Sequence, residues 1–220
     1  MGTAAAPWKQ LLFGAIEANS HLKHSSYAQL VSLPFSILLV LFTQGAKFLS
    51  SVDICRRRLV LMAALRIAPS SSENGERIQI NTDLRSRKIQ ELKQCPFSEM
   101  CWYFSDTWEQ FRINGRVEVI DASNTDQTKL QLREKAWFAN SLKSRMTYTC
   151  PAPGMPYNGE QPDQEVKLDP SSGPVADYCL MLLEPEKVDY LNLKSNQRLL
   201  FSSMISGTGD KCWTSEKVNP

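Results

Sequence analysis

Alternating apolar and polar positions dominate the second half of the chain and predict strands there. In EQFRINGRVEVI (109–120), Phe111, Ile113, Val117 and Val119 share one parity across Gly115, which is typical of a strand that carries a bulge. The same reasoning predicts further short strands at 77–81, 100–105, 177–183, 187–193, 197–203 and 211–218.

Helical periodicity is confined to a few segments. Residues 7–18 repeat apolar side chains on one face after Pro7 and are predicted to form a helix. A short helix is also predicted over residues 86–94, with Ser86 at its start. A third helix is predicted over 126–142, with Leu130, Trp137 and Leu142 on its buried side. The Pro- and Gly-rich stretch 150–176 is predicted to be a long loop. Together these elements predict a single, mainly β domain, a small β-barrel with peripheral helices.

Composition narrows the classes of function. The 220 residues carry 25 basic and 23 acidic side chains, so the net charge of +2 provides no basic face for nucleic acid. Six cysteines without C-x-x-C spacing and only two histidines argue against a metal site. The first residues lack the order of a secretory signal, and the apolar run 31–43 is too short and too interrupted to span a membrane. We therefore expect a soluble protein of the reducing, intracellular, cytoplasmic compartment.

The sharpest local pattern is the octapeptide NTDLRSRK (81–88), where a strand ends and a helix begins. Ser86, Arg87 and Lys88 open that helix, and free amides at a helix start favour a phosphate. Arg87 would fork onto phosphate oxygens, and Lys88 would add a point charge. The alternative is that Ser86 is an ordinary N-cap, followed by two solvated cations.

Gln110 is the second candidate, on the long strand 109–120. Gln110 and Arg112 share the face opposite Phe111, where the amide of Gln110 would hydrogen-bond the edge of a flat heterocycle. The alternative is a solvent-facing strand position. Trp213 either stacks on a ring or closes the core. The sequence assigns no catalytic acid, base or nucleophile.

The segment IQINTDLRSRKIQELKQCPFSEMCWYFSDTWEQFRINGRVEVI resembles the pyridoxamine 5′-phosphate oxidase-like family of FMN-binding split barrels, in its plant and cyanobacterial branch. The resemblance covers residues 7–30 and 74–220 and extends through APWKQLLFGAIEAN, EKAWFANSLKSR, EPEKVDYLNLKSNQRLLF and CWTSEKVNP. It implies a split β-barrel and a homodimer with FMN at the subunit interface. It also implies oxidation of pyridoxamine or pyridoxine 5′-phosphate to pyridoxal 5′-phosphate, a step of vitamin B6 metabolism.

The resemblance also assigns residues to the flavin site. Asn81 and Thr82 match positions that contact FMN at the end of a strand, and the positions of Arg87 and Lys88 grip its phosphate, next to Ser86. The family glutamine that approaches the flavin corresponds to Gln110, and an arginine near the flavin corresponds to Arg198.

Two departures from the better-known oxidases keep other functions open. Leu191 stands where those enzymes have Trp, and their R-L-H substrate clamp is absent from KSNQR (194–198). One alternative is therefore a module that binds flavin or pyridoxal phosphate without oxidase turnover. Another is an inactive isoform that cannot complete its barrel.

Residues 31–73 match no part of the family pattern, in which a strand, a turn and a second strand continue close to ATVGSNGRPSNRTVVFR. Reading residues 56–73 with the codons shifted by two bases permits that family sequence throughout; Met62-Ala63, for example, forces a Gly codon. Val31-Ser32 and Cys55-Arg56 are compatible with splice-donor and splice-acceptor sequences. We interpret 31–56 as a retained intron and 56–73 as exon read out of frame, with the frame restored near Asn74, so this segment is excluded from the fold prediction.

Overall fold

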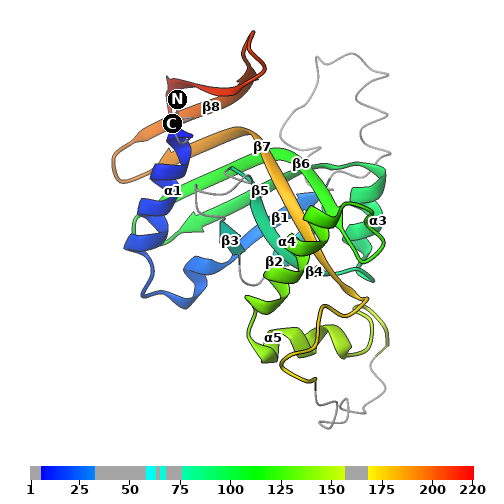
Figure 1. Ribbon diagram of the computed structural model, residues 1–220. Coiled ribbons are helices and arrows are strands. Elements are labelled where there is room, and N and C mark those ends of the chain that lie inside the picture. Colours follow the sequence, from blue (N-terminus) through cyan, green and yellow to red (C-terminus); the bar gives the residue numbers. More distant parts are fainter. Residues whose placement is uncertain (1–5, 33–57, 63–64, 68–75, 157–167) are drawn as a thin grey trace.

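A computed structural model describes residues 6–32, 58–62, 65–67, 76–156 and 168–220. Within this part of the chain the strands form one sheet in the order β2-β1-β5-β6-β7-β4-β3, to which β8 is joined at β7 and β9 at β8 (Figure 1). The strands are β1 (Ala28–Ser32), β2 (Arg58–Met62), β3 (Leu65–Ile67), β4 (Ile78–Asp83), β5 (Phe97–Phe104), β6 (Glu109–Ile120), β7 (Tyr178–Asn192), β8 (Gln197–Ile205) and β9 (Lys211–Val218). The helices are α1 (Pro7–Ala18), α3 (Arg87–Gln94), α4 (Gln127–Phe138) and α5 (Leu142–Met146), with 3₁₀ turns η1 (Lys23–Ser26) and η3 (Thr147–Thr149).

The sheet divides at β7. One edge of this strand pairs with β6 along nearly its whole length. The other edge pairs with β4 through residues 178–183 and with β8 through residues 187–192. β4 and β8 therefore diverge from a common strand, and the sheet curls into a barrel that is open between them. This arrangement confirms the mainly β, split-barrel fold expected from the sequence.

β7 is one strand, where the sequence predicted two, at 177–183 and 187–193. The error lies at Pro185, which has no N–H for the ladder and reads locally as a turn. The register shifts between Asn114 and Gly115 of β6, where the bulge was predicted, but the extra residue is Glu186 of β7, because Asn114 lies opposite Lys187 and Gly115 opposite Pro185. A Cβ on Gly115 would lie 1.9 Å from the carbonyl oxygen of Glu184, so only glycine allows the two strands to approach this closely.

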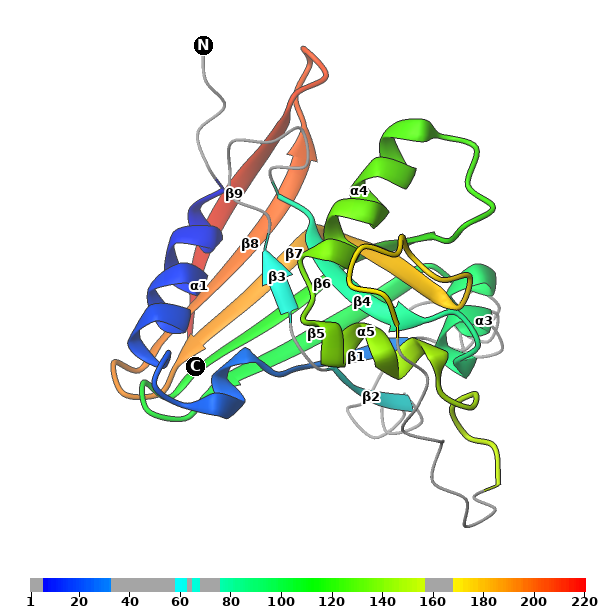
Figure 2. The ribbon, with the colours of Figure 1, turned by 60° about the horizontal axis from the view of Figure 1, so that its bottom comes forward.

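Every second side chain of each strand points inward and fills the interior of the barrel, and α1 closes one end of it. Ile78 and Ile80 of β4, Trp102 and Phe104 of β5 and Phe111 of β6 are fully buried or nearly so. Burying side chains of this size stabilises the fold by about 1.5–3 kcal/mol each. α1 covers the end beside β8 and β9 (Figure 2) and contributes Trp8, Leu12 and Ala15 to the core. Trp213 packs edge-on against Trp8 at 5.8 Å between ring centroids, so it closes the core, as the second of its two interpretations held.

Two helices replace the single one predicted over 126–142. Asp126 caps α4 by accepting from the N–H groups of Thr128 and Lys129, and Ser141 caps α5 by accepting from that of Ser144. Because Ser141 is a second N-cap within the predicted helix, one helix ends before it and another begins after it. Trp137 is buried as predicted, but Leu130 and Leu142 are only half-buried, and Arg133 and Ala136 take the buried positions.

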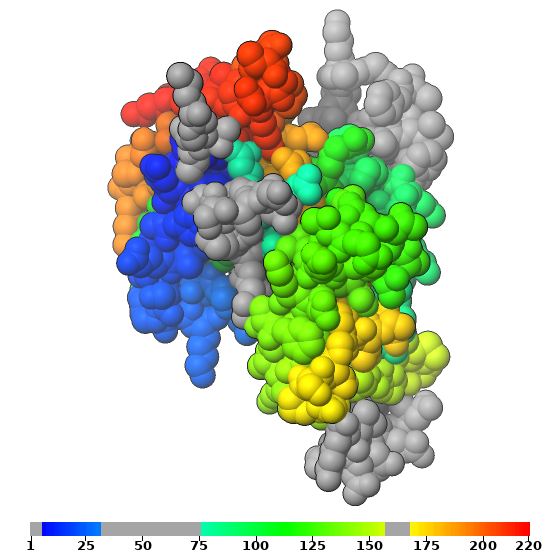
Figure 3. All heavy atoms as spheres, viewed as in Figure 1, coloured from blue at the N-terminus to red at the C-terminus, as the bar shows by residue number. Residues whose placement is uncertain are grey.

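α4, α5 and residues 168–177 lie together as one block (Figure 3), and Ala136 of α4 packs against Ile120, Leu180 and Leu182 on the outer face of the sheet. Arg133 donates to the carbonyl oxygens of Val175 and Tyr178 at 2.7 Å, and Arg145 donates to that of Pro170 at 2.8 Å. These two buried guanidinium groups attach the end of the predicted loop 150–176 to the helices. The middle of that loop lies outside the described residues.

Parts of the segment 31–73 are described. β1 pairs with β2, and β3 pairs with β4, both antiparallel. Most of the apolar run 31–43 lies outside the described residues. Among the helices that the structure describes, none is long and apolar enough to cross a membrane.

Candidate functional site

The predicted phosphate loop connects the end of β4 to the start of α3. Asn81 points to the outer face of β4, where its side chain accepts a hydrogen bond from the Tyr178 hydroxyl at 2.7 Å and donates to Asn140 at 3.1 Å. Thr82 points inward, is buried, and lies opposite Cys179 of β7. Alternation along the strand thus directs these neighbouring side chains to opposite faces, so they do not meet at one surface.

The first turn of α3 is not capped by Ser86. The Ser86 hydroxyl donates backwards to the carbonyl oxygen of Asp83 at 2.7 Å and makes no cap hydrogen bond to the helix. The interpretation of Ser86 as an ordinary side-chain N-cap is therefore wrong, although the residue holds the N-cap position. The Ile89 N–H donates to the carbonyl oxygen of Ser86 at 3.0 Å, whereas the N–H groups of Arg87 and Lys88 have no partner among the described residues and face an anion that the helix dipole also favours.

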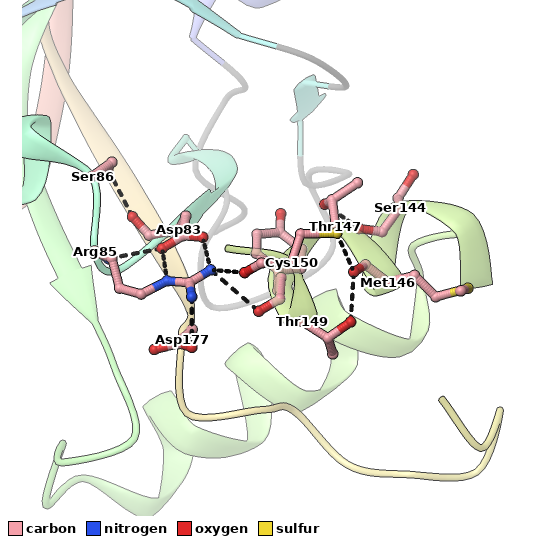
Figure 4. Close-up of polar contacts among 10 residues, drawn as sticks. Asp83, Arg85, Ser86, Ser144, Met146, Thr147, Thr149, Cys150 and Asp177 are labelled. Carbon is pink, nitrogen blue, oxygen red and sulfur yellow. Dashed lines mark hydrogen bonds and ion pairs between the residues drawn. The ribbon is translucent and has the colours of Figure 1, made fainter. Parts of the chain in front are cut away.

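Three cations lie in this loop, and they differ in what they contact. Arg85 is fully engaged by Asp83, Asp177 and two backbone carbonyl oxygens (Figure 4). Arg87 is exposed and Lys88 half-buried, and among the described residues neither has a hydrogen-bond or ion-pair partner. The sequence predicted Arg87 and Lys88 as the pair for a phosphate, and within the described part of the chain these are the two cations of the loop that have no partner.

Lys88 lies in a partly desolvated position. Burial lowers the pKa of its amine below the ordinary 10.5, while the negative charge of Asp83 acts in the opposite direction. Burial also raises the pKa of the Cys179 thiol to about 12, so this thiol is a neutral neighbour of Lys88. A half-buried ammonium without a partner is unfavourable unless an anion joins it.

The second group of predicted residues forms a row across four strands. The ladder places Tyr103 of β5 opposite Gln110 of β6, Gln110 opposite Leu191 of β7, and Leu191 opposite Arg198 of β8. Directly opposed residues share a face, and the burial of Phe111 confirms that Gln110 points outward. The structure thus brings Gln110 and Arg198 to one surface with Tyr103, which is 45% exposed and which the sequence did not single out.

Hydrogen bonds and ion pairs fix the side chains of this row and of the neighbouring row, which consists of Cys101, Arg112 and Asp189. The Gln110 amide donates to the sulfur of Cys101 at 3.4 Å. Arg198 forks onto the two carboxylate oxygens of Asp189 at 3.0 and 2.8 Å, and this hydrogen bonding raises its pKa. Arg112 forks onto Glu99 in the same way. The guanidinium of Arg198 is therefore held in place by a carboxylate on its own sheet.

One chain does not bring the two groups together. Asn81 lies opposite Leu180 of β7, and Gln110 lies opposite Leu191 of the same strand. Those partners are eleven positions apart (191 − 180), a contour length of about 35 Å at 3.3 Å per residue. The phosphate loop and the Gln110–Arg198 row are therefore separate surfaces of the subunit.

The sequence prediction missed Asp83 and Arg85, which lie inside the candidate motif and determine which of its cations stay free. Their signal was a pair of opposite charges two residues apart, at the end of a strand and in the turn that follows it. No cluster of potential metal ligands occurs in the described ranges of the chain.

The sequence of this chain is similar to those of known proteins. Residues 48–121 match the family model described as "Pyridoxamine 5'-phosphate oxidase, FMN-binding domain". This match begins within the segment 31–73, whose origin as intron and out-of-frame exon stays a prediction. The Arabidopsis thaliana protein named pyridoxine/pyridoxamine 5'-phosphate oxidase 2 is 69% identical over 220 residues, which is the whole of both chains.

Solved structures agree with the fold. A pyridoxamine 5'-phosphate oxidase-related, FMN-binding protein from Nostoc punctiforme is 28% identical, with a TM-score of 0.77 and full coverage of both chains. PhzG from Burkholderia lata, 15% identical, has a TM-score of 0.64 over 99% of this chain and 94% of its own, which shows the shared fold. On the full-length identity to the Arabidopsis protein, this chain belongs to the pyridoxamine 5′-phosphate oxidase family of FMN-binding proteins.

Proposed function

We propose that this protein is an FMN-dependent oxidase that converts pyridoxamine or pyridoxine 5′-phosphate to pyridoxal 5′-phosphate. The observation that carries the proposal is the pair of unpartnered cations, Arg87 and Lys88, at the uncapped start of α3. Support comes from the 69% identical Arabidopsis relative, which carries the name of such an oxidase.

The residues of the phosphate loop fit the cofactor. A phosphate dianion requires several donors and cations, and the loop offers backbone amides, the fork of Arg87 and the ammonium of Lys88. Binding would supply Lys88 with the anion that its half-buried position lacks. Thr82 is the inward-facing residue at the end of β4, opposite Cys179, where the strand leads into the loop. Asn81 would fix the end of the strand through Tyr178 and Asn140.

A homodimer would complete the site. The phosphate loop and the row of Gln110 and Arg198 are too far apart along β7 to serve one flavin within a subunit. A second copy that presents its row to the first copy's loop would unite them in two equivalent sites, as a twofold axis requires. Gln110 would then hydrogen-bond the edge of the ring system, and Arg198, held by Asp189, would place a fixed positive charge beside it.

FMN, when bound, supplies the two-electron acceptor chemistry that the oxidation requires. The contribution of this chain is to bind and orient: the loop holds the phosphate, and the row positions the ring. Leu191 lies between Gln110 and Arg198 and presents an aliphatic side chain to that ring. The five cysteines of the described residues are free thiols, which supports the proposed reducing, cytoplasmic location.

The visible spectrum and oxygen uptake of the purified protein test the proposal. Flavin absorbance together with oxygen consumption on addition of pyridoxamine 5′-phosphate supports the oxidase. Flavin absorbance without turnover would favour a binding module, to which Leu191 and the missing R-L-H clamp already point. A protein that is colourless and stays so after incubation with FMN would overturn both and identify an inactive isoform.

A further inference from the structure

Arg85 is the most heavily bonded side chain near the phosphate loop, and the proposed function leaves it without a role. Its Nε and Nη2 fork onto the Oδ1 and Oδ2 of Asp83 at 3.0 and 2.7 Å (Figure 4). Nη2 also donates to the carbonyl oxygens of Cys150 at 3.0 Å and Tyr148 at 3.4 Å. Nη1 lies 3.2 Å from the carboxylate of Asp177. One guanidinium thus joins the end of β4, the turn η3 and the residue that precedes β7.

Asp83 is the carboxylate for which the guanidinium of Arg85 and the ammonium of Lys88 compete. Its side chain is largely buried, and its charge acts on the amine of Lys88. Arg85 occupies both of its oxygens, and Oδ1 also accepts the Arg85 N–H at 2.8 Å. The carbonyl oxygen of the same residue accepts both the N–H and the hydroxyl of Ser86. Asp83 therefore shapes the turn and places a negative charge within the phosphate loop itself.

We infer that Arg85 is a positioning residue for the cofactor phosphate, which keeps the carboxylate of Asp83 paired and away from Lys88. The inference rests on the proposed function. Without Arg85, the carboxylate of Asp83 would lose its guanidinium partner and become available to the ammonium of Lys88, five residues later in the same loop. Lys88 would then be occupied, and the carboxylate, no longer neutralised by Arg85, would repel a phosphate.

The contacts of Arg85 to distant segments add a geometric effect. The carbonyl oxygens of Tyr148 and Cys150 and the carboxylate of Asp177 hold the guanidinium from the side opposite the loop. Leu84 reinforces this attachment, because its N–H donates to the carbonyl oxygen of Asp177 at 2.7 Å. The block formed by α5, η3 and the approach to β7 thus supports the turn from which Arg87 and Lys88 project.

Comparison of FMN with riboflavin tests this role, because the two share the ring system and differ in the phosphate. Dissociation constants for both would be measured by flavin fluorescence on the full chain and on Arg85→Ala. We expect Arg85→Ala to weaken FMN about tenfold and to leave riboflavin unchanged, because the loss is specific to the phosphate. Equal weakening of both ligands would overturn the inference, since it would indicate general damage to the fold.

Two further single variants separate a loss of phosphate binding from general damage to the fold. Arg77→Ala removes a comparable ion pair, with Glu184 at 2.7 Å, from the opposite end of β4 and should leave the ratio of FMN to riboflavin affinity unchanged. Lys88→Ala should lower that ratio; if it does not, the proposed phosphate site itself fails. A lowered ratio for Lys88→Ala with an unchanged ratio for Arg85→Ala would overturn the inference about Arg85 alone.

The double variant Asp83→Asn with Arg85→Ala identifies the competing charge. Asparagine keeps an oxygen for the Arg85-position N–H but carries no charge to pair with Lys88. We expect this double variant to recover most of the FMN affinity lost in Arg85→Ala. FMN affinity that remains at the level of Arg85→Ala would overturn the charge-pairing mechanism.

Discussion

Gln110 and Arg198 flank the same residue of β7, because Leu191 lies opposite Gln110 on β6 and opposite Arg198 on β8. Two residues that are 88 positions apart in the chain (198 − 110) therefore present an amide and a fixed cation on one surface. Two strand spacings separate them, about 10 Å, a distance that a tricyclic ring system spans.

The first prediction concerns Gln110. Gln110→Leu removes the amide and keeps a side chain of similar volume on an outward-facing position. We expect a shifted flavin absorbance spectrum or an altered rate of flavin reduction, with a melting temperature close to that of the unchanged protein. A change confined to the melting temperature would identify Gln110 as a structural residue.

The second prediction concerns the phosphate contact of Arg87. Arg87→Ala should reduce FMN affinity by about 1.5–3 kcal/mol, the range for a charge-assisted hydrogen bond. Lys93→Ala is the matched control, because Lys93 lies at the other end of α3 and pairs with Asp121 at 3.3 Å. Titration with FMN would measure both variants, and equal affinities for the two would contradict the assignment of Arg87.

The third prediction follows from the separation of the loop and the row. If two subunits share each site, Lys88→Ala and Gln110→Leu homodimers both lack an intact site. Mixed dimers of the two variants regain one, so an equal mixture should recover about a quarter of the sites after subunit exchange. Activity that stays at the level of the separate variants, with exchange confirmed by differently tagged subunits, would show that each site lies within one chain.

The fourth prediction concerns pH. Burial lowers the pKa of Lys88 in the free protein below 10.5, so its charged form costs stability at low pH, and this cost disappears as pH rises through the lowered pKa. A bound phosphate favours the charged form and raises the pKa again, so binding takes up a proton. FMN affinity should therefore fall as pH rises from about 7 to about 10.

Lys88→Arg provides the control for this pH dependence, because the guanidinium stays protonated throughout the range. FMN affinity of that variant should vary less with pH than affinity of the unchanged protein. The same pH profile in both proteins would assign the titration to another group.

The fifth prediction concerns residues 31–73. A counterpart in which an in-frame ATVGSNGRP-like sequence replaces this segment should bind FMN much more tightly than the chain as printed. The in-frame sequence supplies polar groups near the start of the barrel, whereas Arg56, Arg57 and Arg58 in a row do not suit an alternating strand. Matched dissociation constants for the two forms would show that the segment is a tolerated insert. Genomic sequence without such an underlying frame would also contradict the interpretation.

Local signals predicted much of the fold. α1, β6 and β9 begin and end where the pattern placed them, because Pro7 and regular apolar alternation mark these elements within their own residues. The continuity of β7 was not predictable locally, since the irregular stretch at Pro185 and Glu186 is held in the sheet by its pairing with β6 at Gly115, about 70 residues earlier in the chain.

In the candidate site, too, the neighbouring sequence predicted some features, whereas others depend on residues that are distant in the chain. The octapeptide 81–88 indicated cations at a helix start, but not which of them stay unpaired. That distinction depends on Asp177 and on the carbonyl oxygens of Tyr148 and Cys150, which are distant in sequence from Arg85. The row of Gln110 and Arg198 likewise required the register of four strands.

The central position of β7 also governs the order in which the protein can be assembled during synthesis. Strands β4 and β6 are made early, but the strand that joins them ends only at Asn192. Until the ribosome has released that residue, the facing edges of β4 and β6 have no partner, and such edges attract other strands. The sheet therefore stays open between β4 and β6 until β7 has been made, and closure of the barrel comes after the pairing of β5 with β6.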